Sequence, residues 1–272
     1  MAEDVLNQIV AHKQRELEAA KAEVSLEELK NQVVNAPKPR NFFRAVTRPK
    51  HQLRVIAEVK KASPSAGTLR DDFDPVAIAR AYYDNGAAAI SCLTDEAYFG
   101  GSLQHLKQIR QAVPLPILRK DFIIEPYQIY EAALAGADAV LLIAECLDEA
   151  KLIDLMILAH ELQLTTLVEV HEMDTLLKVQ PHLGFPLPAY TLLGINNRNL
   201  KTMTTDLAHS LRMAEMIDDL DIVVSESGIR TYDDIRRLMD AGIYHILVGE
   251  HLMKQPDVGD ALRELIGSDT KT

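Results

Sequence analysis

Short apolar segments rich in Val, Ile and Leu recur along most of the chain, separated by segments with helical spacing of apolar residues. Eight strands are predicted, at Leu53–Val59, Ala87–Leu93, Leu115–Leu118, Ala137–Ile143, Thr165–Val170, Thr191–Ile195, Ile222–Ser225 and Tyr244–Val248. Strands that are apolar throughout and alternate with helices indicate a parallel sheet covered on its outer face. Eight strand–helix pairs in about 220 residues predict a (β/α)8 TIM barrel.

Helix boundary signals support this division. Asp74-Pro75 and Glu125-Pro126 each place a capping residue before a first-turn proline, and Thr231 begins another helix with early acidic residues. The alternative fold is a Rossmann-like doubly wound sheet, which shows the same alternation. That fold needs a G-x-G-x-x-G turn after its first strand, and the sequence has none there.

Residues 1–50 follow a different pattern, with apolar residues at helical spacing and no strand. Ser25 and Glu28 form a candidate capping box at the start of a second helix. The proline-containing segment Asn35–Arg40 ends that helical pattern. We therefore predict an N-terminal helical extension over 1–50, followed by the barrel over 51–272.

Composition narrows the class of protein. The 272 residues are 47% hydrophobic and carry a net charge of −11 without a basic block, which argues against binding to nucleic acid or anionic membranes. The longest apolar run, Ala139–Ala144, is too short to cross a bilayer, and the acidic N-terminus does not resemble a signal peptide. Cys92 and Cys146 lie in or beside apolar runs, as reduced thiols do. We expect a cytoplasmic protein.

Polar side chains occur at the carboxyl ends of four predicted strands, where barrel enzymes collect their catalytic groups. They are Glu58, Lys60, Lys120, Glu169 and Asn196. Each one alone is compatible with a solvated strand end or a structural ion pair. Together at one mouth they are costly unless they are paired or bind something polar, so we interpret them as a candidate active site.

The loops after the last two strands are rich in small residues. Ser225–Gly228 follows the seventh strand, and Gly249-Glu250 follows the eighth. Plain turn chemistry also uses such residues, but barrels often bind phosphate through backbone amides at these two loops. We therefore predict a phosphate site there, to which Ser63 after the first strand contributes. The carboxylate of Glu250 requires that the anion bind the backbone N–H of this residue.

A local positive field offsets the acidic chain at the same mouth. The cations that we expect there are Lys60, Lys61, Lys120 and Arg198, which suit a substrate with a phosphate and a second anionic group. The nine histidines show no metal-ligand spacing, so we predict no metal site. His171 follows a strand end, and its position at the mouth or on the surface stays open.

Several segments resemble one known family. They are IAEVKKASPSAG (56–67), DFDPVAIARAY (72–82), LTDEAYFGGS (93–102), LRKDFIIEPYQIYEA (118–132), LVEVHE (167–172), GINNRNL (194–200), SESGI (225–229) and LVGEHLM (247–253). These motifs are spread over nearly the whole chain, and through them the sequence resembles the indole-3-glycerol phosphate synthases of tryptophan biosynthesis. The resemblance also implies that the N-terminal helices and the PRNFFRA stretch (39–45) extend over the barrel mouth.

The resemblance implies one reaction. An anthranilate-substituted deoxyribulose 5-phosphate closes its ring, loses carbon dioxide and then water, and becomes indole-3-glycerol phosphate. The only partner implied is this small phosphorylated substrate, with no cofactor and no metal. We expect a monomer, and association with other enzymes of the tryptophan pathway stays open.

Roles follow from the resemblance, motif by motif. Lys120 would be the general acid of ring closure, Glu169 the acid/base of dehydration, and Glu58 with Lys60 would orient and stabilise charge. A lysine acts as an acid near neutral pH when its pKa is depressed, and a second lysine with partial burial would depress it, so we predict a lowered pKa for Lys120. Asn196 would complete this set.

The remaining implied contacts bind substrate. Arg198 would hold the anthranilate and sugar portions together with Asn196, and Ser227 supports the same contacts. The phosphate cradle would be formed by Ser63, Gly228, Gly249 and Glu250. Phe99 and Phe122 would be walls for the aromatic ring. Ala66 replaces a lysine that many relatives carry in SPSKG, which removes one positive charge near the mouth.

Two rival functions stay open. A phosphoribosylanthranilate isomerase-like barrel also binds phosphate, but it needs a cysteine at the end of the first strand, and the sequence has none there. A non-catalytic partner barrel is the other alternative. Loss of catalysis usually appears as loss of charged site residues, and here they are intact.

Overall fold

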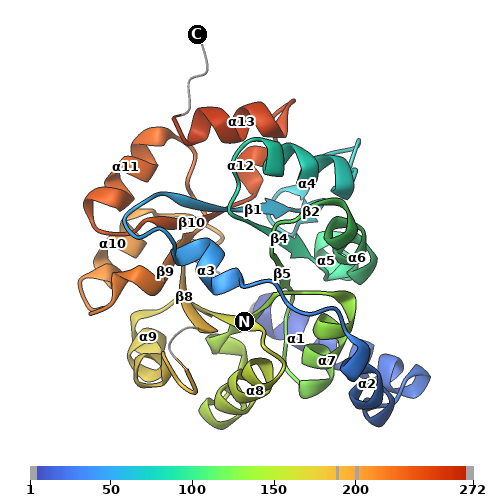
Figure 1. Ribbon diagram of the computed structural model, residues 1–272. Coiled ribbons are helices and arrows are strands. Elements are labelled where there is room, and N and C mark those ends of the chain that lie inside the picture. The colour runs from blue at the N-terminus through green and yellow to red at the C-terminus, as the bar shows by residue number, and fades with distance from the viewer. Residues whose placement is uncertain (1–4, 188–189, 200–201, 268–272) are drawn as a thin grey trace.

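Eight parallel strands form a closed barrel in the computed structural model, which describes residues 5–187, 190–199 and 202–267 (Figure 1). The strands are β1 (Arg54–Val59), β4 (Ala89–Leu93), β5 (Ile117–Lys120), β6 (Ala139–Ile143), β7 (Thr165–Val170), β8 (Thr191–Asn196), β9 (Val223–Glu226) and β10 (His245–Val248). They pair in the order of the sequence, and β1 closes the ring by pairing with both β4 and β10. The predicted (β/α)8 barrel is confirmed.

Helices follow the strands and surround them (Figure 1). They are α4 (Pro75–Asp84), α5 (Glu96–Phe99), α6 (Leu103–Ala112), α7 (Pro126–Ala135), α8 (Glu149–Glu161), α9 (Met173–Val179), α10 (Ala208–Ala214), α11 (Tyr232–Asp240), α12 (Glu250–Met253) and α13 (Val258–Leu265). The predicted start signals are confirmed: Asp74 accepts hydrogen bonds from two amides at the start of α4, and Thr231 forms a capping box with Asp234. None of the helices described here is long and apolar enough to span a bilayer.

Short elements complete the described chain. Among the described residues, single-turn 3-10 helices follow α2, β6 and α9, and another precedes β9. They are η1 (Val33–Asn35), η2 (Ala144–Cys146), η3 (Gln180–His182) and η5 (Leu220–Ile222). After β1, the strands β2 (Ala62–Ser63) and β3 (Gly67–Thr68) pair in an antiparallel hairpin. This hairpin carries the SPSAG segment at the carboxyl end of the barrel.

The core has two layers. The larger one lies between strands and surrounding helices, and the smaller one fills the barrel interior with inward-facing strand residues such as Leu118, Leu141 and Leu192. Phe42 and Val46 join this inner layer and are fully buried. The interior is therefore packed, and its carboxyl end opens into a cavity.

Residues 5–47 form three helices, α1 (Val5–Glu23), α2 (Leu26–Gln32) and α3 (Phe42–Thr47). The predicted capping box of Ser25 and Glu28 starts α2. In Figure 1, α3 lies across the centre of the strand ring. Its Phe43 amide donates a hydrogen bond to Thr165, the first residue of β7, and Ala45 accepts one from Arg54, the first residue of β1.

These contacts place α3 at the amino ends of the strands. The resemblance had placed the stretch 39–45 over the mouth, so that expectation is wrong for this segment. The physical reason is hydrophobic: the inner layer is open at the amino end, and Phe42 and Val46 close it. In contrast, α1 lies at the carboxyl end, where Leu6 and Ile9 line the cavity.

Candidate active site

A cavity of about 410 Å³ occupies the carboxyl end of the barrel. All thirteen site residues predicted from the sequence line it: Glu58, Lys60, Ser63, Phe99, Lys120, Phe122, Glu169, Asn196, Arg198, Ser227, Gly228, Gly249 and Glu250. The strand ends of a parallel barrel meet at one mouth, which is why residues so far apart in sequence come together. Their individual roles stay predictions.

Lys120 lies at the centre of the cavity, among carboxylates. Its Nζ is 3.1 Å from Glu169 Oε2 and 3.3 Å from Glu226 Oε2. Glu226, the last residue of β9, was missed by the sequence analysis although it lies at a strand end like the others. The same rule that selected Glu169 could have found it, because Glu226 directly follows the predicted strand Ile222–Ser225.

Lys60 has a different partner. Its Nζ is 2.6 Å from Glu58 Oε1, and both side chains are largely buried at the end of β1. This pair matches the structural ion pair that the spacing alone allowed. Since Lys60 is neutralised by Glu58, it does not act on Lys120 as an isolated positive charge.

The prediction of a lowered pKa for Lys120 is wrong. Burial lowers the pKa of this ammonium, but Glu169, Glu226 and Glu58 more than offset burial and raise the pKa above its ordinary value. The prediction of a lowered pKa rested on the neighbouring lysine and left out the three carboxylates. Lys120 is therefore a stable cation throughout the neutral range.

The two buried glutamates beside Lys120 titrate in opposite directions. Burial acts against ionisation of Glu169, but Lys120 and then His171 hold the pKa of this carboxyl below its usual range. Burial and the nearby charge of Glu169 raise the pKa of Glu226 well above its usual range, even against Lys120. The surroundings thus favour ionisation of Glu169 and protonation of Glu226 side by side, a pairing suited to acid–base catalysis.

Two glycines leave room for these carboxylates. A Cβ on Gly194 would lie 2.3 Å from Glu226 Oε1, and a Cβ on Gly249 would lie 2.2 Å from Glu58 Oε1. Gly194 is the register partner of Glu169 on the neighbouring strand, so the Glu226 side chain reaches across it toward Glu169. Gly249, predicted only as part of a phosphate cradle, also accommodates Glu58.

Gly194→Ala is expected to lower kcat about tenfold, because the new methyl group displaces the Glu226 carboxyl from Glu169 and Lys120. The backbone of Gly194 does not adopt a left-handed conformation, so alanine itself is tolerated there. Overpacking should also cost about 1–3 kcal/mol of unfolding free energy. Steady-state kinetics and urea denaturation measure both effects. Adding Glu226→Asp to Gly194→Ala should restore much of the lost unfolding free energy. A double variant no more stable than Gly194→Ala would contradict a clash between the new methyl group and Glu226.

The phosphate side of the cavity is formed by the loops after β9 and β10. Ser227 and Gly228 both have positive φ, 67° and 80°, which turns this loop sharply. Arg198 Nη2 lies 2.7 Å from Glu250 Oε2, and Arg198 Nη1 donates to Ser65 Oγ at 3.1 Å. The charge of Glu250, which would repel a phosphate, is therefore neutralised by Arg198 and also by Lys254, whose Nζ lies 2.6 Å from Glu250 Oε1.

Apolar groups form the opposite wall. The rings of Phe99 and Phe122 lie 6.1 Å apart between centroids with a tilt of 36°. Val5, Leu6 and Ile9 of α1 extend this wall across the mouth. A flat aromatic ring therefore has an apolar side to lie on, with the charged groups across from it.

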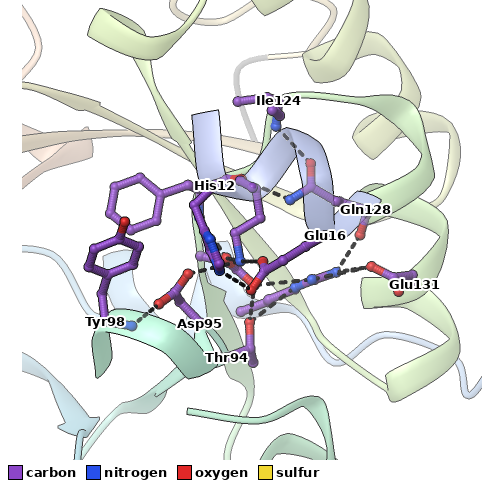
Figure 2. Close-up of polar contacts among 12 residues, drawn as sticks. His12, Glu16, Thr94, Asp95, Tyr98, Ile124, Gln128 and Glu131 are labelled. Atoms are coloured by element: carbon purple, nitrogen blue, oxygen red, sulfur yellow. Dashed lines mark hydrogen bonds and ion pairs between the residues drawn. The ribbon is translucent and has the colours of Figure 1, made fainter. Parts of the chain in front are cut away.

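An ion cluster fixes α1 on the mouth. Lys13 Nζ lies 2.6 Å from Glu16, 2.9 Å from Asp95 and 3.0 Å from Asp121, and Lys13 is buried. Arg119 Nη2 lies 3.1 Å from the second oxygen of Asp121. Figure 2 shows this cluster, in which His12 and Glu16 come down from α1 toward Asp95. The sequence analysis did not select Lys13, since a lysine inside an amphipathic helix is usually solvated.

Asp121 lies between Lys120 and Phe122 in sequence, so the cluster also holds the strand end that carries the central lysine. His171 is buried as well, so it is part of the mouth and not of the surface. Among the residues that the structure describes, no group of three His, Cys, Asp or Glu side chains is arranged to hold a metal ion.

Comparison with known proteins agrees with this geometry. The family described as "Indole-3-glycerol phosphate synthase" matches residues 6–265. The chain is 49% identical over 265 residues to the indole-3-glycerol phosphate synthase of Rhodopirellula baltica, covering 97% of this chain and 99% of that one. It is 44% identical over 266 residues to that of Rhodospirillum rubrum, with the same two coverages.

A solved structure, a thiamine phosphate pyrophosphorylase from Pyrococcus furiosus, superposes with a TM-score of 0.56. The superposition covers 79% of this chain and 94% of the pyrophosphorylase chain. Because the two sequences are only 19% identical, this likeness supports the barrel fold alone. The family match spans nearly the whole chain and includes every strand end described above. The chain belongs to the indole-3-glycerol phosphate synthase family.

Proposed function

We propose that the protein is a carbon–carbon lyase of tryptophan biosynthesis. It converts 1-(2-carboxyphenylamino)-1-deoxy-D-ribulose 5-phosphate into indole-3-glycerol phosphate, carbon dioxide and water. The observation that carries this proposal is the position of Lys120 between Glu169 and Glu226 in a cavity with an apolar wall on one side and glycine-rich loops on the other. Family membership supports the same reaction.

Ring closure needs a group that stabilises negative charge. The aromatic carbon that bears the carboxylate attacks the ketone carbon, and the carbonyl oxygen gains charge as the carbon–carbon bond forms. The Lys120 ammonium donates a hydrogen bond, and then its proton, to this oxygen. Loss of carbon dioxide returns the electron pair of the broken bond to the ring. A buried ammonium fixed by two carboxylates is already oriented for this step, so little reorganisation is needed.

Dehydration needs a base and an acid. The ionised Glu169 removes a proton from the carbon next to the ring nitrogen, and the protonated Glu226 gives its proton to the hydroxyl formed in the first step, which leaves as water. The proton held by Glu169 then passes to Lys120, and a proton from solvent restores Glu226, so that one proton is consumed in each turnover. Glu226, protonated beside Glu169, supplies a neutral hydrogen-bond donor in the same place.

The other predicted residues bind and orient the substrate. Glu58 and Lys60 orient groups at the first strand, and Asn196 with Arg198 holds the sugar and anthranilate portions. Ser227 supports these contacts, and the phosphate cradle combines Ser63, Gly228, Gly249 and the backbone of Glu250. We also propose that residues 1–50 act as a helical extension whose α1 covers the mouth, and that the protein is a cytoplasmic monomer.

The test is direct. The anthranilate-substituted deoxyribulose phosphate is added to purified protein in EDTA without added metal, and indole fluorescence is followed. We expect a rise whose rate is proportional to protein concentration. Turnover of phosphoribosylanthranilate in place of this substrate would support the isomerase, and no turnover of either by folded protein would support the non-catalytic partner barrel.

A further inference from the structure

Three side chains form a line that ends at Glu169. Glu145, in η2 after β6, has Oε2 at 3.1 Å from His171 Nδ1, and its Oε1 accepts a hydrogen bond of 2.7 Å from the His171 backbone amide. On the other side of the ring, His171 Nε2 lies 3.4 Å from Glu169 Oε1. The imidazole of His171 is therefore between two carboxylates, one of which faces the reaction cavity.

The inner nitrogen of this ring has an unusual environment. His171 Nε2 is buried and, among the described residues, has no hydrogen bond of good geometry; its near neighbour is the Glu169 carboxylate. Glu145 does not line the cavity, whereas His171 and Glu169 both do. Glu145 can therefore act on bound substrate only through His171, and His171 acts most directly through Glu169.

Titratable groups face His171 from its own strand and from three neighbouring elements. Glu145 approaches from η2, Lys120 from β5, and Glu169 from its own strand β7, while His209 on α10 hydrogen-bonds the His171 backbone. Burial lowers the pKa of the imidazole, but the two carboxylates outweigh burial and Lys120, so the pKa of His171 lies above its ordinary value. Burial lowers the pKa of His209, so His209 adds no competing charge at neutral pH.

We propose that Glu145 and His171 form a positioning dyad that holds an imidazolium against Glu169 and keeps this carboxylate ionised and oriented for proton abstraction. The dyad deepens the proposed function and rests on it for its catalytic consequence. Without the imidazolium, Glu169 shares one proton more evenly with Glu226, and the fraction of sites with the base in place falls. Lys120 alone then has to compensate both carboxylates.

The sign of the pH dependence follows from this arrangement. A raised pKa means that the imidazolium persists to higher pH than that of an ordinary histidine and is lost as the pH rises through that pKa, so kcat should fall on the alkaline side. Glu145→Gln removes the outer charge but keeps an oxygen for the His171 amide. We expect it to lower the pKa of His171 by about one unit and to move the alkaline fall of kcat down by the same amount. His171→Asn should remove that fall and lower kcat about tenfold at little change in KM.

The experiment combines two readouts on the full-length protein. NMR titration of the histidine ring protons gives the pKa of His171 in the wild type and in Glu145→Gln, without any turnover. The pH profile of kcat is measured for the wild type, both single variants and the double variant. The control is His182→Gln, because His182 and Glu149 form another His–Glu pair, at 2.8 Å, on an exposed part of the chain outside the cavity.

The double variant decides whether the two residues act together. If Glu145 works only through His171, the double variant has the kcat of His171→Asn, whereas two independent effects would multiply. An unmoved pKa of His171 in Glu145→Gln, or multiplied losses in the double variant, would overturn the dyad. Should the wild type fail to turn over the substrate at all, the proposed function is wrong, and the NMR titration still decides whether Glu145 holds the imidazolium.

Discussion

Lys120→Met is expected to lower kcat by about 10³-fold while KM changes much less. The ammonium stabilises charge that develops on the ketone oxygen only as the ring closes, so its loss raises the barrier more than it weakens substrate binding. Methionine keeps most of the volume of lysine. Steady-state assays by indole fluorescence at saturating substrate give kcat, and a substrate titration gives KM.

The control is Lys151→Met, which removes the same charge from an exposed position of α8 outside the cavity and should leave both constants unchanged. Circular dichroism and thermal unfolding confirm that Lys120→Met is folded. Turnover within a few-fold of the wild type would remove Lys120 from the centre of the mechanism. A fall in kcat/KM through KM alone would make it a binding residue.

The raised pKa of Lys120 gives this prediction a pH dependence. A lysine whose pKa lies above its ordinary value keeps its proton throughout the range in which the assay can be run. Any alkaline fall of kcat between about pH 7 and pH 9 must therefore come from another group, and the dyad of Glu145 and His171 provides one. A fall that persists in His171→Asn would instead point back to Lys120 or to the substrate.

The sequence predicts the barrel well because its signal is periodic and local. Each strand is an apolar run, and several helix starts carry a capping residue such as Asp74 or Thr231, so that local preference and global fold agree. The position of α3 could not be predicted in the same way. The stretch 39–45 has no long period, and its place depends on Phe42 filling an opening that only the closed barrel creates.

For the site, the sequence could predict which residues come together but not how their charges are paired. Residues at strand ends could be found because topology alone brings them to one mouth, and Glu226 was within reach of the same rule. The charge balance could not be found, because it depends on distances: Lys60 is 2.6 Å from Glu58, and Lys120 is close to two other carboxylates. Sequence gives the charges near a site, but the pKa of Lys120 depends on which of them touch it.

The buried ion cluster under α1 carries the largest expected effect on stability. Lys13→Met should lower the unfolding free energy by about 3–5 kcal/mol at pH 7, because it leaves Asp95 buried without its cation and leaves Asp121 with Arg119 alone. Burial lowers the pKa of Lys13, but Asp121 and Asp95 outweigh it and hold this pKa above its ordinary value. Burial acts against ionisation of Asp121, but Arg119 and then Lys13 bring its pKa to about 2.

These directions define the pH window of the effect. The contribution of Asp121 is present above its unfolded pKa of about 3.9 and is lost as the pH falls toward 2, and that of Lys13 is present below about 10.4. The unfolding free energies of wild type and Lys13→Met, measured by urea denaturation across this window, should therefore differ most in the neutral range. The loss should shrink at low pH, where protonated aspartates no longer need a cation.

The matched control lies on the same helix. Lys21 pairs with Glu125 at a half-exposed position, so Lys21→Met should cost less than about 1 kcal/mol. Lys13→Met combined with Asp95→Asn should recover part of the loss, because the carboxylate left without a cation is removed. Since α1 places Leu6 and Ile9 on the cavity, Lys13→Met should also raise KM under conditions where it is fully folded. Equal stability of Lys13→Met and Lys21→Met would show that α1 is held on the mouth by its apolar contacts and not by the cluster.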